Sequence, residues 1–426
     1  MNKVCVIGLG YVGLPLALSF SMKGFKVYGV DINSDLINEL KNGITHHLES
    51  YNGKTIQDIL LEELKSERFI PTDNIKQALE ECDNIIVTVP IPVYGGKPYF
   101  EYLTSCANSL KENLRKDQFI LLRSTVVPGT TRNIFMPILE QSGLKCGVDF
   151  YLAYASERIA EGKAFDEFEN MPTAVAANDQ MSLERAINLI RAISKEEVVV
   201  GSSFEVVETS KVIENLQRDI NIAMVNEFER FTKELGIDIF EVIKVANSHK
   251  RVNLLYPGPG VGGFCIPNAF YYLNAKAEEI GVDLKIAKTA RIFNEGIPSY
   301  ISDLAMKMIK QYNVDKKVAV LGIAMKDYSS DDRLSPAHEI VDILISRGVE
   351  VKVFDPAVKS QFSGKVNTIE EALKDCHVVL VLAKQEGIPF ESIKNYTNVN
   401  PLIIIDTRNV YTMDFAKENN IILEKI

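Results

Sequence analysis

The sequence predicts an α/β protein in which two doubly wound parallel sheets are joined by a helical region with a long central helix. Two apolar segments, 3–8 and 317–322, each run into a glycine, and alternating helix-like and strand-like stretches follow each of them. Between them, at about 203–309, apolar residues recur at helical spacing. A chain of 426 residues is long enough for three domains. We expect these domains at 1–200, 201–310 and 311–426.

The strands are expected where short apolar runs separate helical patterns. In the first sheet they are Lys3–Gly8, Lys26–Asp31, Asn84–Pro90, Phe119–Ser124 and Phe150–Tyr154. In the second sheet they are Lys317–Gly322, Glu350–Asp355, Val378–Leu382 and Leu402–Asp406. Short apolar runs between helical patterns are typical of parallel strands that helices cover on both faces.

The segment Glu205–Leu235 has apolar residues spaced for one long helix and contains no proline. A helix of this length is unusual, because the mean in globular proteins is about 11 residues. Its apolar face is too long for one small domain to cover. We therefore expect this helix to link the two sheets and to pair with a second copy of the chain in a homodimer.

Composition argues against several classes of protein. The net charge of −10 argues against a nucleic-acid-binding surface. No run of about 18 apolar residues is present, so no membrane span is expected. The first residues enter a strand without the cleavage site of a signal peptide. The six cysteines form no Cys-x-x-Cys pair, which argues against a metal site and for a reducing, cytoplasmic location.

A glycine-rich turn follows the first expected strand and opens a helix. Its residues are Gly8, Leu9, Gly10, Tyr11, Val12 and Gly13, and Asp31 ends the next strand. The glycines let backbone N–H groups approach a pyrophosphate at the helix N-terminus. The Asp31 carboxylate would bind the adenosine ribose and repel a 2′-phosphate. This fingerprint predicts a Rossmann-like site for NAD rather than NADP; the alternative is a structural turn in another α/β fold.

Two further loops follow strands of the same sheet. One contains Pro90, and the other begins with Ser124 and Thr125. Ligands of doubly wound sheets bind outside the carboxyl ends of the strands. Both loops are therefore placed to touch the cofactor or the reacting carbon, although either alone would be taken for an ordinary turn.

The segment GPGVGGFCIP at 258–267 is the most informative in the chain. Its four glycines make a flexible loop that can wrap a ligand, and Cys265 at its end can lie at a helix N-terminus. The helix dipole there lowers the pKa of a thiol. The segment thus predicts a nucleophilic thiolate, with a buried structural cysteine as the alternative.

Two groups of polar residues are candidates to assist that thiolate. Lys211 and Asn215 are four residues apart on the long helix, so they share a face and can stabilise an oxyanion. Glu157 and Glu161 follow a strand, where either carboxylate can act as a general base toward water. For both groups the alternative is a solvated surface.

Taken together, these segments resemble the UDP-glucose/GDP-mannose dehydrogenase family over nearly the whole chain. The motifs, in order, are GLGYVGLPLA at 8–17, STVVPGTT at 124–131, Glu157 with Arg158, Lys211 with Asn215, NIAMVNE at 221–227, GPGVGGFCIP at 258–267, and Lys326 with Asp332, Arg333, Ser335 and Pro336. The resemblance implies an NAD domain, a linking helical domain with a dimer helix, and a C-terminal nucleotide-sugar domain.

The family reaction implies a four-electron oxidation of the C6 alcohol of a UDP-sugar to a uronic acid, through a thiohemiacetal and a thioester on Cys265. By the same resemblance, Lys211 and Asn215 hold the C6 oxygen, while Glu161 and Thr125 position or activate the water. The residues that the resemblance assigns to the substrate are Glu157, Arg158, Lys211, Asn215, Tyr256, Gly258, Gly260, Gly262, Lys326 and Arg333. Arg333 is also a candidate to reach across a dimer.

The chain departs from the family pattern at several positions. Ala269 stands where an Asp is usual, Phe264 where His or Ser is frequent, and Ile91 where a Thr is expected. The stretch 327–330 after Lys326 also differs. Loss of the Asp removes one possible charge partner of Lys211 and one possible base for hydrolysis. Activity is therefore expected to be slow, altered or stopped at a partial oxidation.

The stretches 161–164 and 271–273 favour the branch that acts on UDP-N-acetylhexosamines, such as UDP-GlcNAc or UDP-ManNAc. One alternative is a UDP-glucose 6-dehydrogenase. Another, of a different class, is a degenerate, non-catalytic nucleotide-sugar-binding paralogue, which Ala269 and Ile91 favour. A third is a two-electron hydroxy-acid or 6-phosphogluconate-type dehydrogenase, which the cysteine loop and the second α/β domain disfavour.

Overall fold

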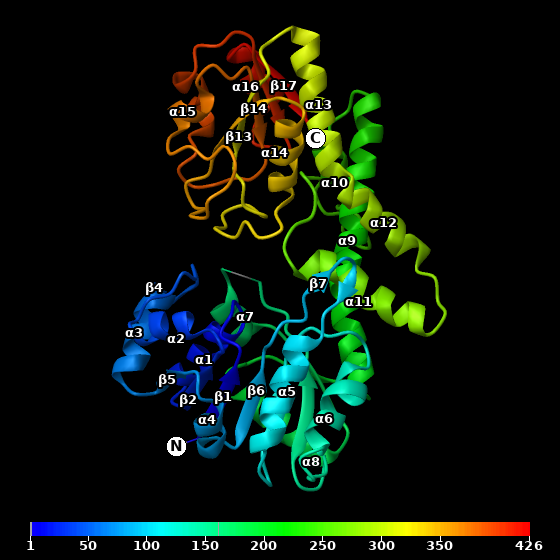
Figure 1. The fold of residues 1–426 in the computed structure, drawn as a ribbon. Helices are drawn as coiled ribbons and strands as arrows, with labels where there is room; N and C mark the ends of the chain where they lie inside the picture. Colours follow the sequence, from blue (N-terminus) through cyan, green and yellow to red (C-terminus); the bar gives the residue numbers. More distant parts are fainter. Residues whose placement is uncertain (1, 161) are drawn as a thin grey trace. The chain divides into compact units, whose positions relative to one another are not determined.

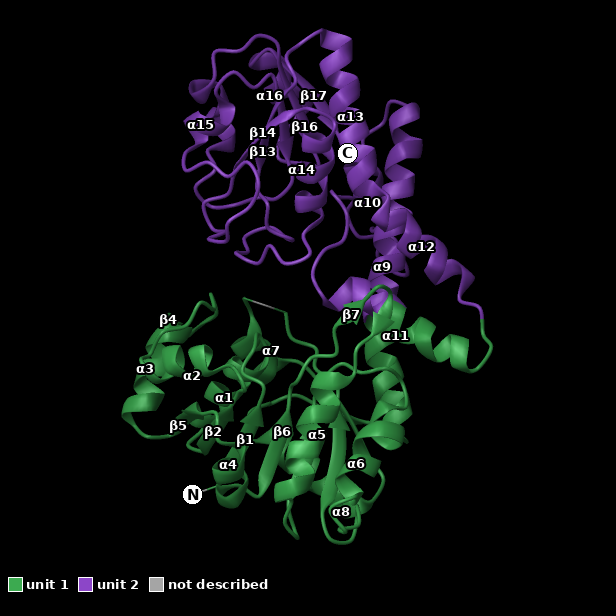
Figure 2. Ribbon diagram, in the orientation of Figure 1, with its two compact units in different colours: residues 1–214, 271–282 green, residues 215–270, 283–426 purple. Residues whose placement is uncertain are grey.

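The structure is a computed structural model, and it describes residues 2–160 and 162–426. The chain divides into two compact units, coloured separately in Figure 2. Unit 1 is Met1–Glu214 with Tyr271–Val282, and unit 2 is Asn215–Phe270 with Asp283–Ile426. Each unit contains one large sheet, which confirms the expectation of two sheets in one chain.

The sheet of unit 1 is eight-stranded, in the order β12-β11-β10-β9-β6-β1-β2-β5 (Figure 1). Its strands are β1 Lys3–Ile7, β2 Lys26–Val30, β5 Phe69–Thr72, β6 Asn84–Val87, β9 Phe119–Leu122, β10 Tyr151–Ala155, β11 Thr173–Ala177 and β12 Val198–Val200. Neighbouring strands are parallel, except that β10 and β11 are antiparallel. The carboxyl ends of β1, β6 and β9 therefore meet at one edge of the sheet.

Helices and two small hairpins complete unit 1. They are α1 Gly13–Met22, α2 Ser34–Lys41, α3 Ile56–Lys65, α4 Ile75–Glu81, α5 Glu101–Asn113, the π-helical turn η1 Thr131–Phe135, α6 Met136–Glu140, α7 Ala164–Asn170 and α8 Gln180–Arg191, with hairpins β3 Ser50–Tyr51/β4 Lys54–Thr55 and β7 Val93–Tyr94/β8 Lys97–Pro98. Local chemistry fixes where several begin: Asn33 caps α2, and Thr55 forms a capping box with Asp58 at α3. Helix α1 is buried in all but its last residue, because it packs between the sheet and the helices α3 and α7.

Unit 2 contains a five-stranded, fully parallel sheet in the order β14-β13-β15-β16-β17. Its strands are β13 Lys317–Leu321, β14 Glu350–Phe354, β15 Val378–Val381, β16 Leu402–Asp406 and β17 Ile421–Lys425. Alternate residues of β13 enter different cores: Val318 and Val320 pack with the helices α13 Ile297–Tyr312 and α14 Pro336–Ser346. Ala319 and Leu321 pack with α15 Ile369–Leu373, α16 Met413–Glu418 and the 3-10 segment η2 Phe390–Tyr396. Helices thus cover both faces, and the predicted doubly wound sheet is confirmed.

The predicted long helix is α9, which runs unbroken from Phe204 to Glu234. The prediction at 205–235 is right to within one residue at each end. Three further helices follow it: α10 Ile239–Ala246, α11 Cys265–Glu279 and α12 Lys285–Glu295. Within residues 2–160 and 162–426, no helix is long and apolar enough to cross a membrane.

Candidate active site

The turn after β1 has the close packing that a dinucleotide fingerprint requires. Gly8 has a φ of +93°, and a Cβ on Gly13 would lie 1.7 Å from the carbonyl oxygen of Gly8. A Cβ on Gly10 would meet nothing within 4 Å, so this part of the turn is open to a close ligand. Tyr11 is exposed and Val12 half-buried. The turn therefore offers a cradle for a pyrophosphate at the start of α1.

Asp31 follows β2 and is bonded to the same turn. One of its carboxylate oxygens accepts a hydrogen bond from the Leu9 N–H at 2.8 Å, and the other accepts one from the Asn33 N–H at 2.9 Å. The residue is only half-buried, so the carboxylate is accessible to a ribose hydroxyl. The turn and Asp31 together fit the pyrophosphate and the ribose of a dinucleotide.

The segment that follows β9 exposes a single residue to solvent or to a ligand. From Gln118 to Thr131 every residue is buried except Thr125, which is half-buried. Ser124, the other residue expected to meet the cofactor here, is 6% exposed. Thr125 is therefore the residue of this segment that a ligand can reach.

The loop after β6 combines an exposed and a buried residue. Pro90 is exposed, as a cofactor contact requires. Ile91, which departs from the family pattern, is buried, and its carbonyl oxygen accepts a hydrogen bond from the Tyr272 hydroxyl. Tyr272 belongs to α11, so the helix that begins with Cys265 also fastens this loop.

Glu157 and Arg158 are held by partners within unit 1. One Glu157 oxygen lies 2.7 Å from the Arg123 guanidinium, and the other accepts the backbone N–H groups of Arg158 and Ile159. The Arg158 side chain pairs with Glu214. For Glu157, which is 7% exposed, the alternative of a solvated surface is wrong. Glu161, expected to act on the water, lies outside the described residues.

Lys211 and Asn215 are both buried on α9, at 8% and 1% exposure. The alternative of a solvated helix face is therefore wrong for this pair. The Asn215 side-chain amide donates to the backbone carbonyl of Cys265 at 3.2 Å, and its oxygen accepts from Arg218 at 2.5 Å. The structure thus brings together two residues, Asn215 and Cys265, that the sequence separates by fifty positions.

Cys265 is the first residue of α11 and is exposed, as a helix-terminal nucleophile must be. The alternative of a buried structural cysteine is wrong. The other cysteines contrast with it. Cys146 is partly buried, and Cys5, Cys82, Cys106 and Cys376 are fully buried. Burial raises the pKa of Cys82 and of Cys106 to about 12, so these thiols remain protonated at neutral pH.

The glycines before Cys265 are required by close packing within unit 2. A Cβ on Gly260 would lie 2.9 Å from the Pro336 side chain, and one on Gly262 would lie 2.8 Å from the Leu334 carbonyl oxygen. The segment packs on the loop before α14 so closely that side chains at Gly260 and Gly262 would not fit. At its start, the Gly258 N–H donates to the Asn226 side chain at 3.1 Å.

Next to these glycines, Tyr256 is 60% exposed and stacks on Phe240 with ring centroids 5.7 Å apart. Its exposed aromatic face is available to a ligand. Tyr256 is therefore exposed at the start of the glycine segment, whereas the next three residues, 257–259, are buried.

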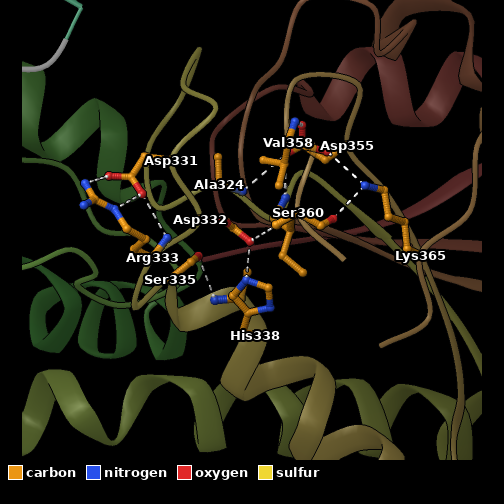
Figure 3. A network of polar contacts seen from close by, with 12 residues as sticks. Ala324, Asp331, Asp332, Arg333, Ser335, His338, Asp355, Val358, Ser360 and Lys365 are labelled. Atoms are coloured by element: carbon orange, nitrogen blue, oxygen red, sulfur yellow. Dashed lines mark hydrogen bonds and ion pairs between the residues drawn. The ribbon is translucent and has the colours of Figure 1, made fainter. Parts of the chain in front are cut away.

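The loop before α14 carries the cations expected to bind phosphate. Arg333 makes a two-point contact with the Asp331 carboxylate, at 2.8 Å and 2.6 Å (Figure 3). Its guanidinium also lies over the ring of Phe264, 5.2 Å from the centroid. Arg333 therefore lies beside Phe264, the residue before Cys265. Lys326 lies on the same loop.

Arg408 is a further cation at this site that sequence reasoning missed. Its guanidinium contacts both oxygens of Asp327 at 2.8 Å, and a Cβ on Gly258 would lie 3.0 Å from it. The signal was available, because Arg408 follows the carboxyl end of β16. No group of three potential metal ligands occurs in the part of the chain that the structure describes.

Three models of one family match successive parts of the chain. They are the NAD binding domain of the UDP-glucose/GDP-mannose dehydrogenase family at 2–193, its central domain at 205–296, and its UDP binding domain at 319–413.

Individual relatives match over most of their length. The UDP-N-acetyl-D-mannosamine dehydrogenase of Pyrococcus horikoshii is 31% identical, over 96% of each chain. The UDP-N-acetyl-D-glucosamine 6-dehydrogenase of Pseudomonas aeruginosa is 36% identical, over 84% of each. A solved structure of UDP-D-ManNAc dehydrogenase from Pyrococcus horikoshii superposes with a TM-score of 0.90 at 30% identity, covering 100% of this chain and 99% of that one.

Proposed function

Because the chain belongs to the UDP-glucose/GDP-mannose dehydrogenase family and is an NAD-dependent nucleotide-sugar 6-dehydrogenase, we propose that its substrate is a UDP-N-acetylhexosamine. The names of the two relatives above, at 31% and 36% identity, support this sugar class. The observation that carries the proposed mechanism is the exposed Cys265 at the start of α11, bonded through its backbone to Asn215.

In the proposed reaction, the cofactor is held by the turn at Gly8, Gly10 and Gly13 and by Asp31. NAD bound there would supply the hydride acceptor for both oxidations at C6. The Asp31 carboxylate binds the ribose hydroxyls and disfavours a 2′-phosphate, because like charges at close range repel. Pro90, which is exposed, and Thr125, which is half-buried, would border the cofactor from the neighbouring strand ends.

Cys265 performs the covalent step between the two oxidations. Its thiolate adds to the C6 aldehyde, forming a carbon–sulfur bond and placing negative charge on the C6 oxygen. Lys211 and Asn215 stabilise that oxyanion. After the second oxidation, water attacks the thioester carbonyl, the carbon–sulfur bond breaks and the thiolate leaves as the uronic acid forms. Thr125 and Glu161 position this water.

The UDP-sugar is held on unit 2 by Tyr256, by the glycine segment and by the cations Lys326, Arg333 and Arg408. Fixed guanidinium groups suit phosphate oxygens, and the Asp partners of both arginines set their orientation. Glu157 and Arg158, which bond to Arg123 and to Glu214, act in this proposal by holding the loop that leads to Glu161. Glu157 and Arg158 are the remaining residues that the sequence analysis assigned to the substrate.

We also propose a homodimer formed through α9. Apolar side chains remain exposed along this helix, with Ile213, Phe228 and Phe231 at 50%, 40% and 64%. Exposed aromatic and aliphatic side chains in such a row favour burial against another chain. Light scattering at micromolar concentration tests this proposal, and a monomer throughout would contradict it.

Two alternatives rest on specific features. A UDP-glucose 6-dehydrogenase would follow the same proposed mechanism with a different sugar. A non-catalytic nucleotide-sugar-binding paralogue is favoured by Ala269 and Ile91, both nearly fully buried apolar residues at positions where the family has polar ones. A panel of UDP-ManNAc, UDP-GlcNAc and UDP-glucose, with NADH formation as the readout, separates the three.

The replacement Cys265→Ser tests the covalent mechanism. Turnover to uronic acid is expected to fall roughly 1,000-fold or more, because a serine hydroxyl is a far poorer nucleophile without a dedicated base. Affinity for the UDP-sugar should change little, since the two side chains are nearly isosteric. Cys146→Ser, at a partly buried cysteine outside the site, is the matched control. Wild-type rates in Cys265→Ser would contradict the covalent role.

A further inference from the structure

Glu208 on α9 is a fully buried carboxylate that the proposed mechanism does not use. It is 0% exposed. One of its oxygens accepts the backbone N–H of Gly129 at 2.5 Å, and the other accepts the backbone N–H of Thr131 at 2.9 Å. Both hydrogen bonds therefore go to one short segment of backbone, at the start of the π-helical turn η1.

That segment is the one that presents Thr125. Thr125 is the half-buried exception in an otherwise buried stretch from Gln118 to Thr131. The β9 strand fixes the start of the stretch, and Glu208 fixes its far end. The position of Thr125 is thus determined by the sheet on one side and by α9 on the other.

Holding a loop with a buried carboxylate costs hydration free energy. Burial raises the pKa of Glu208, while the hydrogen bonds from the Thr131 and Gly129 segment lower it, so the N–H groups only partly offset the loss of hydration. The charged and titratable groups that interact electrostatically with Glu208 are Glu205, Arg132 and Tyr154. A neutral serine or threonine cap would satisfy such N–H groups at lower cost. The rigidity of a two-point, charge-assisted contact is what the carboxylate adds.

The same helix carries Lys211, three residues after Glu208 and on the same side of α9. A rigid link from Glu208 to the loop therefore also sets the loop relative to the lysine. Lys211 and Thr125 belong to the same compact unit.

We propose that Glu208 is a positioning residue. Its hydrogen bonds to the backbone of Gly129 and Thr131 hold this segment against α9 and so fix the position of Thr125 relative to Lys211. The inference rests on the proposed function for the roles of Thr125 and Lys211. A misplacement of a catalytic group by about 1 Å can cost on the order of 100-fold in rate. Loss of the Glu208 hydrogen bonds is therefore expected to lower kcat.

The test is a double-mutant cycle between Glu208→Gln and Thr125→Val, assayed as NADH formation from UDP-ManNAc or UDP-GlcNAc. The glutamine keeps one acceptor but turns an NH2 group toward the second N–H. Glu208→Gln alone is expected to lower kcat about 10- to 100-fold, with the KM values for NAD and for the sugar nucleotide changed less than about threefold. In the Thr125→Val background the same change should cost less than about twofold, because the residue it positions is gone.

Glu205→Gln is the matched control. Glu205 lies one turn earlier on α9 and binds the same segment through the side chain of Arg132, at 2.5 Å, but at the protein surface. It should leave kcat within about twofold. If Glu208→Gln does not fold, Glu208→Asp, which keeps the charge but shortens the reach, goes through the same cycle with the same expectations.

Additive effects of the two substitutions, or an equal loss in Glu205→Gln, would overturn the positioning role. A loss confined to KM would overturn it as well. These outcomes are distinct from failure of the proposed function, in which the wild-type protein itself would form no NADH from either sugar nucleotide.

Discussion

Each sheet has a first strand that runs into a glycine turn, but the two turns are followed by different structures. After β1, residues 8–12 lead directly into α1. After β13, residues 322–335 form a long loop before α14 begins. Both glycines, Gly8 and Gly322, have a positive φ, of +93° and +83°. The frameworks are alike up to this residue and diverge beyond it.

The aspartates at the ends of the neighbouring strands differ in the same way. Asp31, after β2, is half-buried and accepts one backbone hydrogen bond on each oxygen. Asp355, after β14, is buried. It accepts hydrogen bonds from the backbone of Ile323, Ala324, Ala357 and Val358 and from the Gln385 side chain, several of them visible in Figure 3.

The difference teaches how one framework serves two kinds of ligand. In unit 1 the short turn leaves a compact cradle and an accessible carboxylate, which suits a dinucleotide. In unit 2 the carboxylate is used internally to fold a long loop, and that loop supplies Lys326 and Arg333. A phosphate in unit 2 is therefore expected to meet side-chain cations, whereas a pyrophosphate in unit 1 meets backbone N–H groups.

The largest expected effect is on stability, and it separates the two aspartates. Asp355→Asn should lower the free energy of unfolding by about 3 kcal/mol, because the amide NH2 would face buried backbone donors. Asp31→Asn should lower it by less than about 1 kcal/mol, since the residue is half-exposed. Denaturant unfolding of both variants checks this. An equal loss of unfolding free energy in the two variants would mean that both carboxylates stabilise the fold to the same extent, which would contradict the comparison.

The next effect concerns cofactor choice. Asp31→Asn removes the charge that opposes a 2′-phosphate, so the preference for NAD over NADP, as a ratio of kcat/KM values, should fall about 100-fold. Asp355→Asn should leave that ratio unchanged in the folded fraction. Steady-state kinetics with both cofactors provides the measurement. An unchanged ratio in Asp31→Asn would remove the assigned role of this carboxylate.

The smallest effect tests the cations of the second turn. Lys326→Met should weaken binding of the UDP-sugar about tenfold, because one charge-assisted contact to an oxyanion is lost. Binding of NAD should not change. Lys316→Met, at the opposite end of β13, is the control and should leave both affinities unaltered. Calorimetric titration with UDP-ManNAc and with NAD decides the matter, and a tenfold loss for NAD would contradict the division of ligands.

Much of the fold follows from local pattern. Most of the strands that the sequence predicts are short runs of mainly apolar residues, as in Leu402–Asp406. The sequence analysis missed β5, β11, β12 and β17 of the two large sheets. The missed strands β12 Val198–Val200 and β17 Ile421–Lys425 do carry β-branched or aliphatic residues, whereas β5 and β11 are unusual. Phe69–Thr72 contains a proline at the sheet edge, and Thr173–Ala177 is rich in alanine and pairs antiparallel with its neighbour. Neither carries the signal that distinguishes a buried parallel strand.

The site divides in the same way. The motif residues were found because glycine, cysteine and lysine have distinctive chemistry at fixed spacing. Arg408 was missed although its place after the carboxyl end of β16 was a usable signal. Asp355 was missed because its importance lies in a partner distant in sequence, Ile323. Glu208 was missed because nothing in the sequence of a long amphipathic helix separates a buried carboxylate from a solvated one. These are consequences of tertiary packing, which a single sequence does not display.

The most direct test of the central claim is the number of NADH molecules formed per UDP-sugar consumed. Wild-type protein is incubated with limiting UDP-ManNAc, or with UDP-GlcNAc if that is the better substrate, and excess NAD, and the product is identified by mass spectrometry. A four-electron oxidation through Cys265 predicts two NADH for each sugar nucleotide and a UDP-uronic acid as the product. One NADH with a C6 aldehyde as the final product, or binding of the sugar nucleotide without any NADH, would contradict the account.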